Sequence, residues 1–261
     1  MDLLNRDFLL VDKPAGMSSF AVVARVRRIL TEQMREDYTR RGLTPPKKAK
    51  VGHAGTLDPF ATGLLICLLG KGTKKAGEFL KKDKRYEATI CLGKTSTTGD
   101  IEGELSEYDI SGAPVGRPVV TGALPTPCSR CRKMAPEIHI PDNSQVQSVI
   151  KSFQGQIKQR VPAYSAVKIN GRRAYDLARK GVQVEMPERE VEIYEISIID
   201  YKWPYLKIDC KVSSGTYIRA LGEDIGKALG VGGYLTELRR TEIGDFSIKD
   251  AVTLEDLGIT D

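Results

Sequence analysis

Strict alternation of apolar and polar side chains at residues 86–93 and 205–212 constrains this chain more than any other feature of its sequence. From Leu206 to Val212 every second residue is apolar, and the residues between them are charged. A period of two fits a strand with one buried face, so the chain must contain a sheet that other elements cover on that face. Further apolar runs predict strands at residues 8–12 and 191–199.

Three further segments have the spacing of amphipathic helices. The first follows Ser18 or Ser19, either of which can cap it. The others cover residues 145–153 and 218–229, and Gly230 follows as a C-terminal cap. Strands and helices mix without regular β-α-β alternation. We therefore predict an α+β fold, in which helices pack on one continuous sheet.

Two segments are expected to be surface insertions. Residues 32–50 are charged and contain a Pro-Pro pair, which is typical of an exposed loop. Residues 107–142 contain six prolines and show little periodicity. This second segment holds Cys128 and Cys131, and His139 follows. Three ligands fall short of the four that a structural zinc site needs, so we expect no metal and interpret the cysteine pair as incidental.

The positive charge of the chain is segregated. The formal net charge is +6, but residues 20–50, 71–85 and 156–180 together hold 23 Lys and Arg against six Asp and Glu. Grouped basic charge is what a polyphosphate partner needs, because each neutralised phosphate releases counterions. Solvated basic faces would give the same composition, so charge alone leaves both interpretations open.

No segment predicts a membrane span or a secretory signal. The 261 residues suffice to bury a core, but the longest apolar run, at residues 63–69, is too short to cross a bilayer. Residues 1–7 lack a basic region followed by an apolar stretch. We therefore expect a cytoplasmic protein with no membrane partner.

The strongest chemical signal is the glycine-rich segment at residues 52–63. It holds three glycines, one histidine, one aspartate and one proline. Glycine admits backbone angles closed to other residues, and Pro59 fixes the backbone directly after Asp58. Such a loop can hold one carboxylate at a defined depth. For an isolated Asp-Pro pair, a turn with a capping aspartate would be the better interpretation.

This segment resembles the catalytic motif of the TruB family of pseudouridine synthases. Five other segments resemble motifs of that family and follow its order, at residues 11–19, 84–86, 164–175, 214–219 and 238–240. Six motifs in register are a specific signal, where a single one would be weak. The resemblance implies a pseudouridine synthase fold, with a mixed and largely antiparallel sheet, flanking helices and a central active-site cleft. It also implies an enzyme that converts uridine to pseudouridine in tRNA without a cofactor.

The resemblance implies three catalytic residues. Asp58 matches the catalytic carboxylate, which either adds to C1′ of the sugar or takes a proton from C2′, and the sequence leaves both routes open. Arg219 matches the arginine that pairs with it, and this arginine should lower the pKa of the carboxyl and orient it through a two-pronged contact. Tyr86 matches the tyrosine that stacks on the flipped base, although the alternating pattern alone favours a core aromatic.

The resemblance also implies substrate-binding residues. His53 matches a histidine that fills the space left by the extruded nucleotide, and an acid–base role is the minor alternative. Residues 155–185 match a loop that clamps the RNA. Leu238 matches an apolar residue near the target uracil, where a core leucine is nearly as good an interpretation. The other residues assigned to substrate binding are Lys13, Gly55, Thr56, Leu57, Tyr164 and Lys168.

We expect residues 1–257 to form one catalytic domain, followed by a tail at residues 258–261. Bacterial relatives usually continue into a small C-terminal RNA-binding domain, which we expect to be absent. The resemblance implies a monomer that acts on the T-arm of tRNA, at position 55. Two other functions stay open: a catalytically silent RNA-binding or RNA-folding protein of the same fold, and the same isomerisation on another RNA. The presence of both Asp58 and Arg219 argues against the silent protein.

Overall fold

The computed structural model describes residues 2–108 and 140–258, apart from residues 166, 170, 180, 183 and 184. These residues form one nine-stranded sheet with the order β1-β3-β12-β4-β11-β10-β7, in which β2 also pairs with β3 and β13 with β12. Of these pairings, only that of β12 with β3 is parallel. The predicted α+β fold with a mixed, largely antiparallel sheet is therefore confirmed. The strands are β1 (Phe8–Lys13), β2 (Val51–Ala54), β3 (Thr62–Leu69), β4 (Lys84–Leu92), β7 (Gly155–Arg160), β10 (Glu188–Lys202), β11 (Tyr205–Val212), β12 (Gly233–Ile243) and β13 (Phe246–Ser247).

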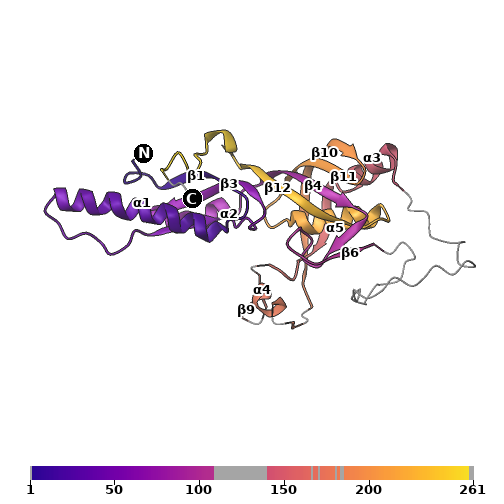
Figure 1. The fold of residues 1–261 in the computed structure, drawn as a ribbon, viewed down its shortest axis with the longest axis horizontal. Helices are drawn as coiled ribbons and strands as arrows, with labels where there is room; N and C mark the ends of the chain where they lie inside the picture. Colours follow the sequence, from indigo (N-terminus) through magenta and orange to yellow (C-terminus); the bar gives the residue numbers. More distant parts are fainter. Residues whose placement is uncertain are drawn as a thin grey trace, which may run out of the picture.

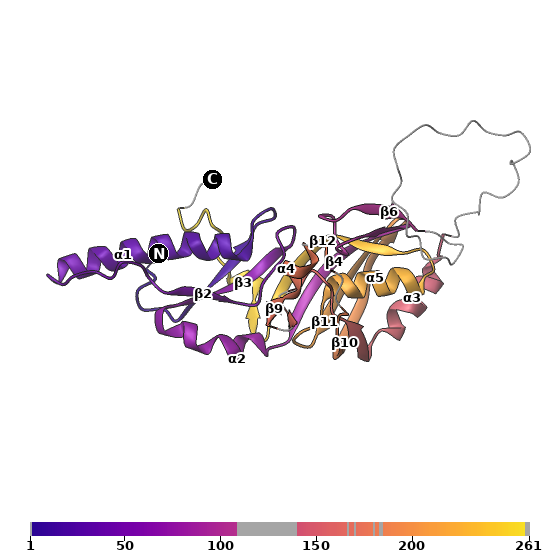
Figure 2. The same ribbon diagram turned by 90° about the horizontal axis from the view of Figure 1, so that it is seen from below.

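Helices flank the sheet in two groups at opposite ends of the molecule (Figures 1 and 2). One group holds α1 (Ser19–Arg40) and α2 (Ala76–Leu80), and the other holds α3 (Asn143–Ser152) and α5 (Ile218–Ala228). A short helix, α4 (Ala174–Ala178), and the hairpin of β8 (Lys168–Ile169) and β9 (Arg172–Arg173) stand apart from the sheet in Figure 1. The remaining elements are β5 (Lys94–Ser96), which pairs with β6 (Leu105–Glu107), and the 3-10 turns η1 (Gly70–Lys75) and η2 (Ile248–Asp250).

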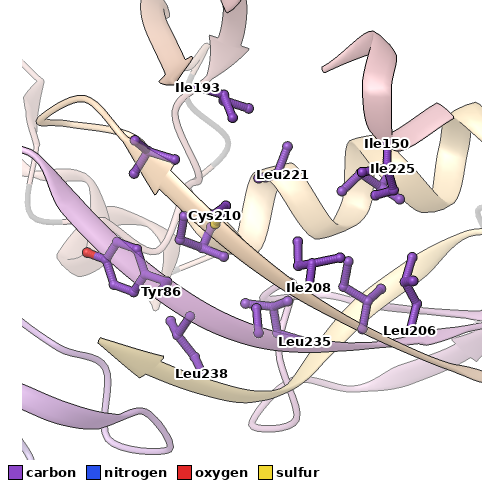
Figure 3. Packing of buried hydrophobic residues seen from close by; sticks show 14 of the residues in the cluster. Tyr86, Ile150, Ile193, Leu206, Ile208, Cys210, Leu221, Ile225, Leu235 and Leu238 are labelled. Atoms are coloured by element: carbon purple, nitrogen blue, oxygen red, sulfur yellow. The ribbon is translucent and has the colours of Figure 1, made fainter. Parts of the chain in front are cut away.

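The main core lies where β4, β11 and β12 meet α5. Side chains of β4 alternate between buried and partly exposed positions from Lys84 to Ile90, which confirms the predicted alternation. Tyr86 lies opposite Cys210 of β11 and opposite Arg240 of β12. Figure 3 shows Leu221 and Ile225 of α5 packing over the strands, with Tyr86 and Leu238 beside each other at the far side of the cluster. The packing of α5 thus positions the β4 face that carries Tyr86.

Helix α1 is longer than the sequence predicted. Ser18 caps its start, because its side chain accepts a hydrogen bond from the Ala21 N–H, as expected. Residues 32–50 were expected to form a loop, but the helix continues to Arg40, so that expectation is wrong for residues 32–40. The Glu, Gln, Met and Arg residues of this stretch are good helix formers, and their charges lie on a solvated face. The chain leaves the helix at Gly42, whose φ of 68° suits glycine.

The other predicted helices are confirmed within two residues at each end. Helix α3 begins after Asp142, whose carboxylate and the Gln145 side chain form a reciprocal capping box. Helix α5 ends at Ala228, and Gly230 follows with a φ of 74°. In the part of the chain that the structure describes, no helix is long and apolar enough to cross a membrane. Cys128, Cys131 and His139 lie outside the described residues.

Candidate active site

Asp58 lies in the loop that joins β2 to β3, and the backbone on both sides of it is held in place. The hydroxyl of Ser19, in the first turn of α1, accepts a hydrogen bond from the Leu57 N–H (2.8 Å) and donates one to the Leu57 carbonyl (2.9 Å). The Pro59 carbonyl accepts a hydrogen bond from the ammonium of Lys13 (3.1 Å). Strand β1 and helix α1 therefore fix the residues that precede and follow the carboxylate.

Lys13 is a support of this loop and has no exposed surface. Its ammonium donates to the carbonyls of Pro14 (2.8 Å), Met17 (2.6 Å) and Pro59 (3.1 Å), which replace lost hydration. Burial lowers the pKa of Lys13 to about 8, and the nearby carboxylate of Asp58 opposes this shift. The sequence assigned Lys13 to substrate binding, and its ammonium here holds the backbone of the loop that carries Asp58.

Arg240 of β12 ties down the two ends of the same loop. Its side chain is buried, and it donates to the carbonyls of Leu64 (2.8 Å) and Gly55 (3.0 Å). Gly63 has a φ of 103°, and a Cβ there would lie 2.3 Å from the backbone oxygen of Arg240. The close approach of β12 therefore requires glycine at this position of the motif.

Arg219, in the first turn of α5, lies beside the Asp58 carboxylate. Its Nε is 3.0 Å from the Asp58 Oδ2, and the side chain of Arg219 is 6% exposed. Its Nη1 donates to the Thr98 carbonyl and its Nη2 to the Tyr164 carbonyl, both at 2.8 Å. The expected pairing is present, but the two-pronged contact is not, because the outer nitrogens of the guanidinium are held by backbone carbonyls. These carbonyls fix the plane in which Nε meets the carboxylate.

Asp100, which sequence reasoning missed, is a second carboxylate on Arg219. Its Oδ2 lies 3.3 Å from the Arg219 Nη1, and its side chain is 3% exposed. The Thr98 hydroxyl (2.5 Å) and the Glu102 N–H (3.0 Å) donate to its other oxygen. A buried carboxylate with this many donors is held in one orientation. Arg219 thus bridges a buried carboxylate and a more exposed one.

The pKa of the Asp58 carboxyl is raised above its ordinary value of 3.8, mainly because burial disfavours the charge. Asp100 acts in the same direction, while Arg219 and Lys13 oppose it. The sequence predicted that Arg219 would lower this pKa; its effect has the predicted sign but is smaller than that of burial. The side chain of Asp58 is 35% exposed, so the group is desolvated and still open to a substrate on one side.

Tyr86 and Leu238 belong to the same buried cluster as Leu57 of the Asp58 loop. Tyr86 is 8% exposed and Leu238 is 7% exposed. Figure 3 shows the two side chains next to each other, on neighbouring strands β4 and β12. The two side chains form an apolar wall. Leu57, which directly precedes Asp58, packs in the same cluster and so connects this wall to the Asp58 loop. Packing of this kind is compatible with the core interpretation of both residues.

His53 lies in β2, opposite Cys67 of β3. Burial lowers the pKa of His53 below its ordinary value of 6.5, and the charge of Arg240 adds to the shift. Its Nδ1 is buried and has no hydrogen-bond partner within the described residues. Thr56, two residues before Asp58, is exposed.

The segment at residues 155–185 is linked to the site through Tyr164. Its carbonyl accepts the hydrogen bond from Arg219 (2.8 Å), and its ring meets that of Tyr175 edge to face with centroids 6.2 Å apart. Tyr175 is 42% exposed, and the guanidinium of Arg179 lies 5.5 Å from its ring centre. Lys168 lies in β8. The segment therefore carries exposed aromatic and basic groups at one end and holds Arg219 at the other.

Family models match most of this chain. The TruB family pseudouridylate synthase N-terminal domain matches residues 41–117 and 118–218, and the tRNA pseudouridylate synthase B C-terminal domain matches residues 219–259. A tRNA pseudouridine synthase B from Bordetella avium is 39% identical over 95% of this chain and 85% of its own length. One from Chloroherpeton thalassium is 38% identical over 98% and 93%. The chain belongs to the TruB family.

Two solved structures contain chains with the same fold as this chain. In a Cbf5-Nop10-Gar1 complex, one chain superposes with a TM-score of 0.59 at 27% identity, over 96% of this chain and 53% of its own. The archaeal box H/ACA sRNP Nop10-Cbf5 complex gives a TM-score of 0.58 at 26% identity. This chain therefore spans about half the length of those structural relatives.

Gln159 is a further residue that sequence reasoning missed, and it supports the helix that carries Arg219. It is 1% exposed in β7, its amide nitrogen donates to the Tyr217 carbonyl (3.0 Å), and its amide oxygen accepts from the Tyr217 N–H (2.8 Å). Tyr217 directly precedes α5, so this amide fixes the start of the helix that carries Arg219. A single glutamine in a basic segment gives no sequence signal that it will fix the start of a distant helix. For Asp100 a signal existed, since Gly99 and Gly103 flank it as glycines flank Asp58.

Proposed function

We propose that this chain isomerises uridine to pseudouridine at position 55 in the T-loop of cytoplasmic tRNA, as a monomer and with Asp58 as its catalytic carboxylate. The observation that carries the proposal is the contact of Asp58 with a buried Arg219 at 3.0 Å, in the loop that matches the family's catalytic motif. The tRNA substrate is supported by relatives at 37–40% identity that are named tRNA pseudouridine synthase B. Strands from both ends of the described chain share one sheet, which supports treating residues 1–257 as one catalytic domain.

The chemistry needs a carboxylate and no redox step. The bond between C1′ and N1 of uracil breaks, the base turns, and C1′ joins C5, while C5 loses a proton and N1 gains one. The ionised Asp58 starts this sequence either by adding to C1′ or by taking a proton from C2′. Arg219 and Lys13 are the positive groups that favour its ionised form. Among the described residues no group of His, Cys, Asp and Glu is arranged to hold a metal ion, and the proposed isomerisation requires none.

The remaining residues of the site suit an extruded base. A uridine flipped out of its loop would stack on the apolar wall of Tyr86 and Leu238, next to Leu57. The ring of His53, whose pKa burial lowers, would fill the space that the base leaves. The exposed Thr56 and its neighbour Gly55 would contact the RNA. Tyr164 and Lys168, which belong to the clamping segment, would bind phosphate and ribose groups of the RNA.

Tritium release from uridine labelled at C5 tests the proposed substrate directly, because C5 loses its hydrogen when it bonds to C1′. We expect one equivalent of tritium per molecule of unmodified tRNA, and turnover of an isolated T-arm stem-loop, whose loop bases are accessible. A tRNA with cytidine at position 55 should release none. Release from that control tRNA would move the target to another uridine, and no release from any tRNA would favour a silent RNA-binding protein.

The pH dependence of kcat/KM should report the raised pKa of Asp58. The reaction needs the ionised carboxylate, so activity is full above the pKa of the folded enzyme and is lost as pH falls through it. Because burial raises that pKa above 3.8, the acid limb should lie at a higher pH than an ordinary aspartate would give. Single-turnover rates across the acid range, with circular dichroism to monitor folding, measure the limb. A limb at or below 3.8 would contradict the desolvation of Asp58.

A further inference from the structure

A groove runs along the middle of α1. It has a volume of about 320 Å³ and separates the helix from the segment that contains Lys47 and Lys48. Its charged lining residues are Arg27, Arg28, Arg35, Lys47 and Lys48, with Glu32 as the one acid among its lining residues. Figures 1 and 2 both show α1 extending beyond the end of the sheet. We refer to this feature as the α1 groove.

The two sides of the α1 groove are fixed to each other. Thr31 is 8% exposed, and its hydroxyl accepts a hydrogen bond from the Ala49 N–H (3.0 Å) and donates one to the Arg27 carbonyl (2.6 Å). The Arg27 guanidinium also donates to the Val51 carbonyl (3.1 Å). Buried hydrogen bonds of this kind hold a backbone in register. Lys47 and Lys48 are therefore held beside the helix and are not carried on a free loop.

No carboxylate among the described residues forms a salt bridge with the cations of the α1 groove. Arg28, Arg35, Lys47 and Lys48 are exposed. Like charges that face one another across a groove repel, and a polyanion removes that repulsion while releasing its own counterions. The groove is thus built to receive negative charge.

An exposed aromatic residue connects the groove to the catalytic loop. Phe20 is 66% exposed, and the guanidinium of Arg27 lies 5.8 Å from the centre of its ring. Phe20 directly follows Ser19, whose hydroxyl holds Leu57 beside Asp58. With a rise of 1.5 Å per residue, Arg27 to Arg35 lie about 12–24 Å along the helix from Ser19. An exposed ring beside a guanidinium is a surface on which nucleobases stack. An acidic protein would bind the cations but would make no use of such a ring, so the ring favours RNA as the polyanion that occupies the groove.

We propose that the α1 groove binds the phosphate backbone of the RNA substrate outside the nucleotide that enters the active site, with Phe20 stacking on a base between the two. This inference rests on the proposed function, because it takes the RNA bound at Asp58 as the occupant. It assigns the longer-than-expected α1 and residues 41–50 a role in affinity for large RNA. The groove contributes no group to the chemistry.

The test compares two double variants with the same change in net charge. Lys47→Glu/Lys48→Glu reverses the charge of the groove. Lys202→Glu/Lys227→Glu reverses two exposed lysines on β10 and α5, which Figure 1 shows at the other end of the molecule. Filter binding to unmodified full-length tRNA should show Kd raised about tenfold or more for the groove variant, with a log Kd–log salt slope shallower by about 1 to 2. The control should change Kd less than threefold. Phe20→Ala should raise Kd with little change in the salt slope, since it removes stacking and no charge.

Equal losses in the two charge-matched variants would overturn the proposal, because they would reflect net charge alone. An unchanged Kd in the groove variant would overturn it as well. Turnover of a saturating T-arm stem-loop should stay at the wild-type kcat in all three variants, and a fall in kcat would contradict a role confined to binding. Binding is measured without turnover, so a wild-type protein that binds tRNA but releases no tritium would refute the proposed function and leave the test of the groove valid.

Discussion

Replacing Asp58 by asparagine should reduce kcat at least about a hundredfold and leave the Kd for tRNA nearly unchanged. Asparagine has the same shape but no charge, so it neither adds to C1′ nor accepts a proton from C2′. The backbone of the loop should persist, because Ser19, Lys13 and Arg240 hold it through main-chain atoms. Tritium release under single-turnover conditions and filter binding measure the two quantities. Residual activity above about one percent of wild type would contradict a catalytic role for Asp58.

The fold should tolerate this change. Arg219 keeps Asp100 and two backbone carbonyls as partners after Asp58 is neutralised. In addition, the pKa of Asp58 is raised in the folded state, so the ionised carboxyl is unfavourable to folding above that pKa, and asparagine removes this effect. The melting temperature at neutral pH should therefore not fall. Asp209→Asn is a matched control for Asp58→Asn. Arg85 bridges the carboxylates of Asp209 and Glu195 outside the site. Arg219 bridges those of Asp58 and Asp100 in the same way.

The sequence predicted the elements that carry the site better than the contacts within it. Alternation along β4 and β11 and the amphipathic period of α5 are local patterns, and all three elements formed where they were expected. Residues 32–40 were missed because charge was interpreted as a sign of a loop, whereas charged residues of good helix propensity extend a helix as readily. The Pro-Pro pair at residues 45–46 ends no helix here, since the chain has already turned at Gly42.

Long-range contacts explain why other features of the site could not be predicted. Lys13 and Pro59 are 46 positions apart, and Arg219 and Thr98 are 121 apart. No periodicity connects such residues, so the burial of Lys13 and the bridging of Arg219 between two carboxylates depend on how the sheet folds. The raised pKa of Asp58 has the same origin, because it reflects the surroundings of the loop more than the arginine that the motif supplies.

The replacement of Arg219 by lysine should reduce kcat at least about tenfold, because an ammonium is a point charge and does not reproduce the planar fork. Three nitrogens of Arg219 have different partners: Nε faces Asp58, Nη1 donates to the Thr98 carbonyl and Nη2 to the Tyr164 carbonyl. Lysine preserves the charge but not this arrangement, so the carboxylate loses its orientation and the clamping segment loses its anchor. Rates must be measured where circular dichroism shows full folding, since unpaired buried carbonyls also destabilise the protein.

A double variant separates positioning from general damage. If Arg219 acts by orienting Asp58, then Asp58→Asn/Arg219→Lys should be scarcely slower than Asp58→Asn alone, since residues that act as a unit are not additive. Independent effects would multiply instead, and that result would assign Arg219 a role apart from Asp58. Arg85→Lys, which alters a matched arginine between two carboxylates outside the site, should leave turnover within about threefold of wild type. Near-normal turnover by Arg219→Lys itself would show that Asp58 needs only a nearby positive charge, and the geometry of the pair would then have no part in catalysis.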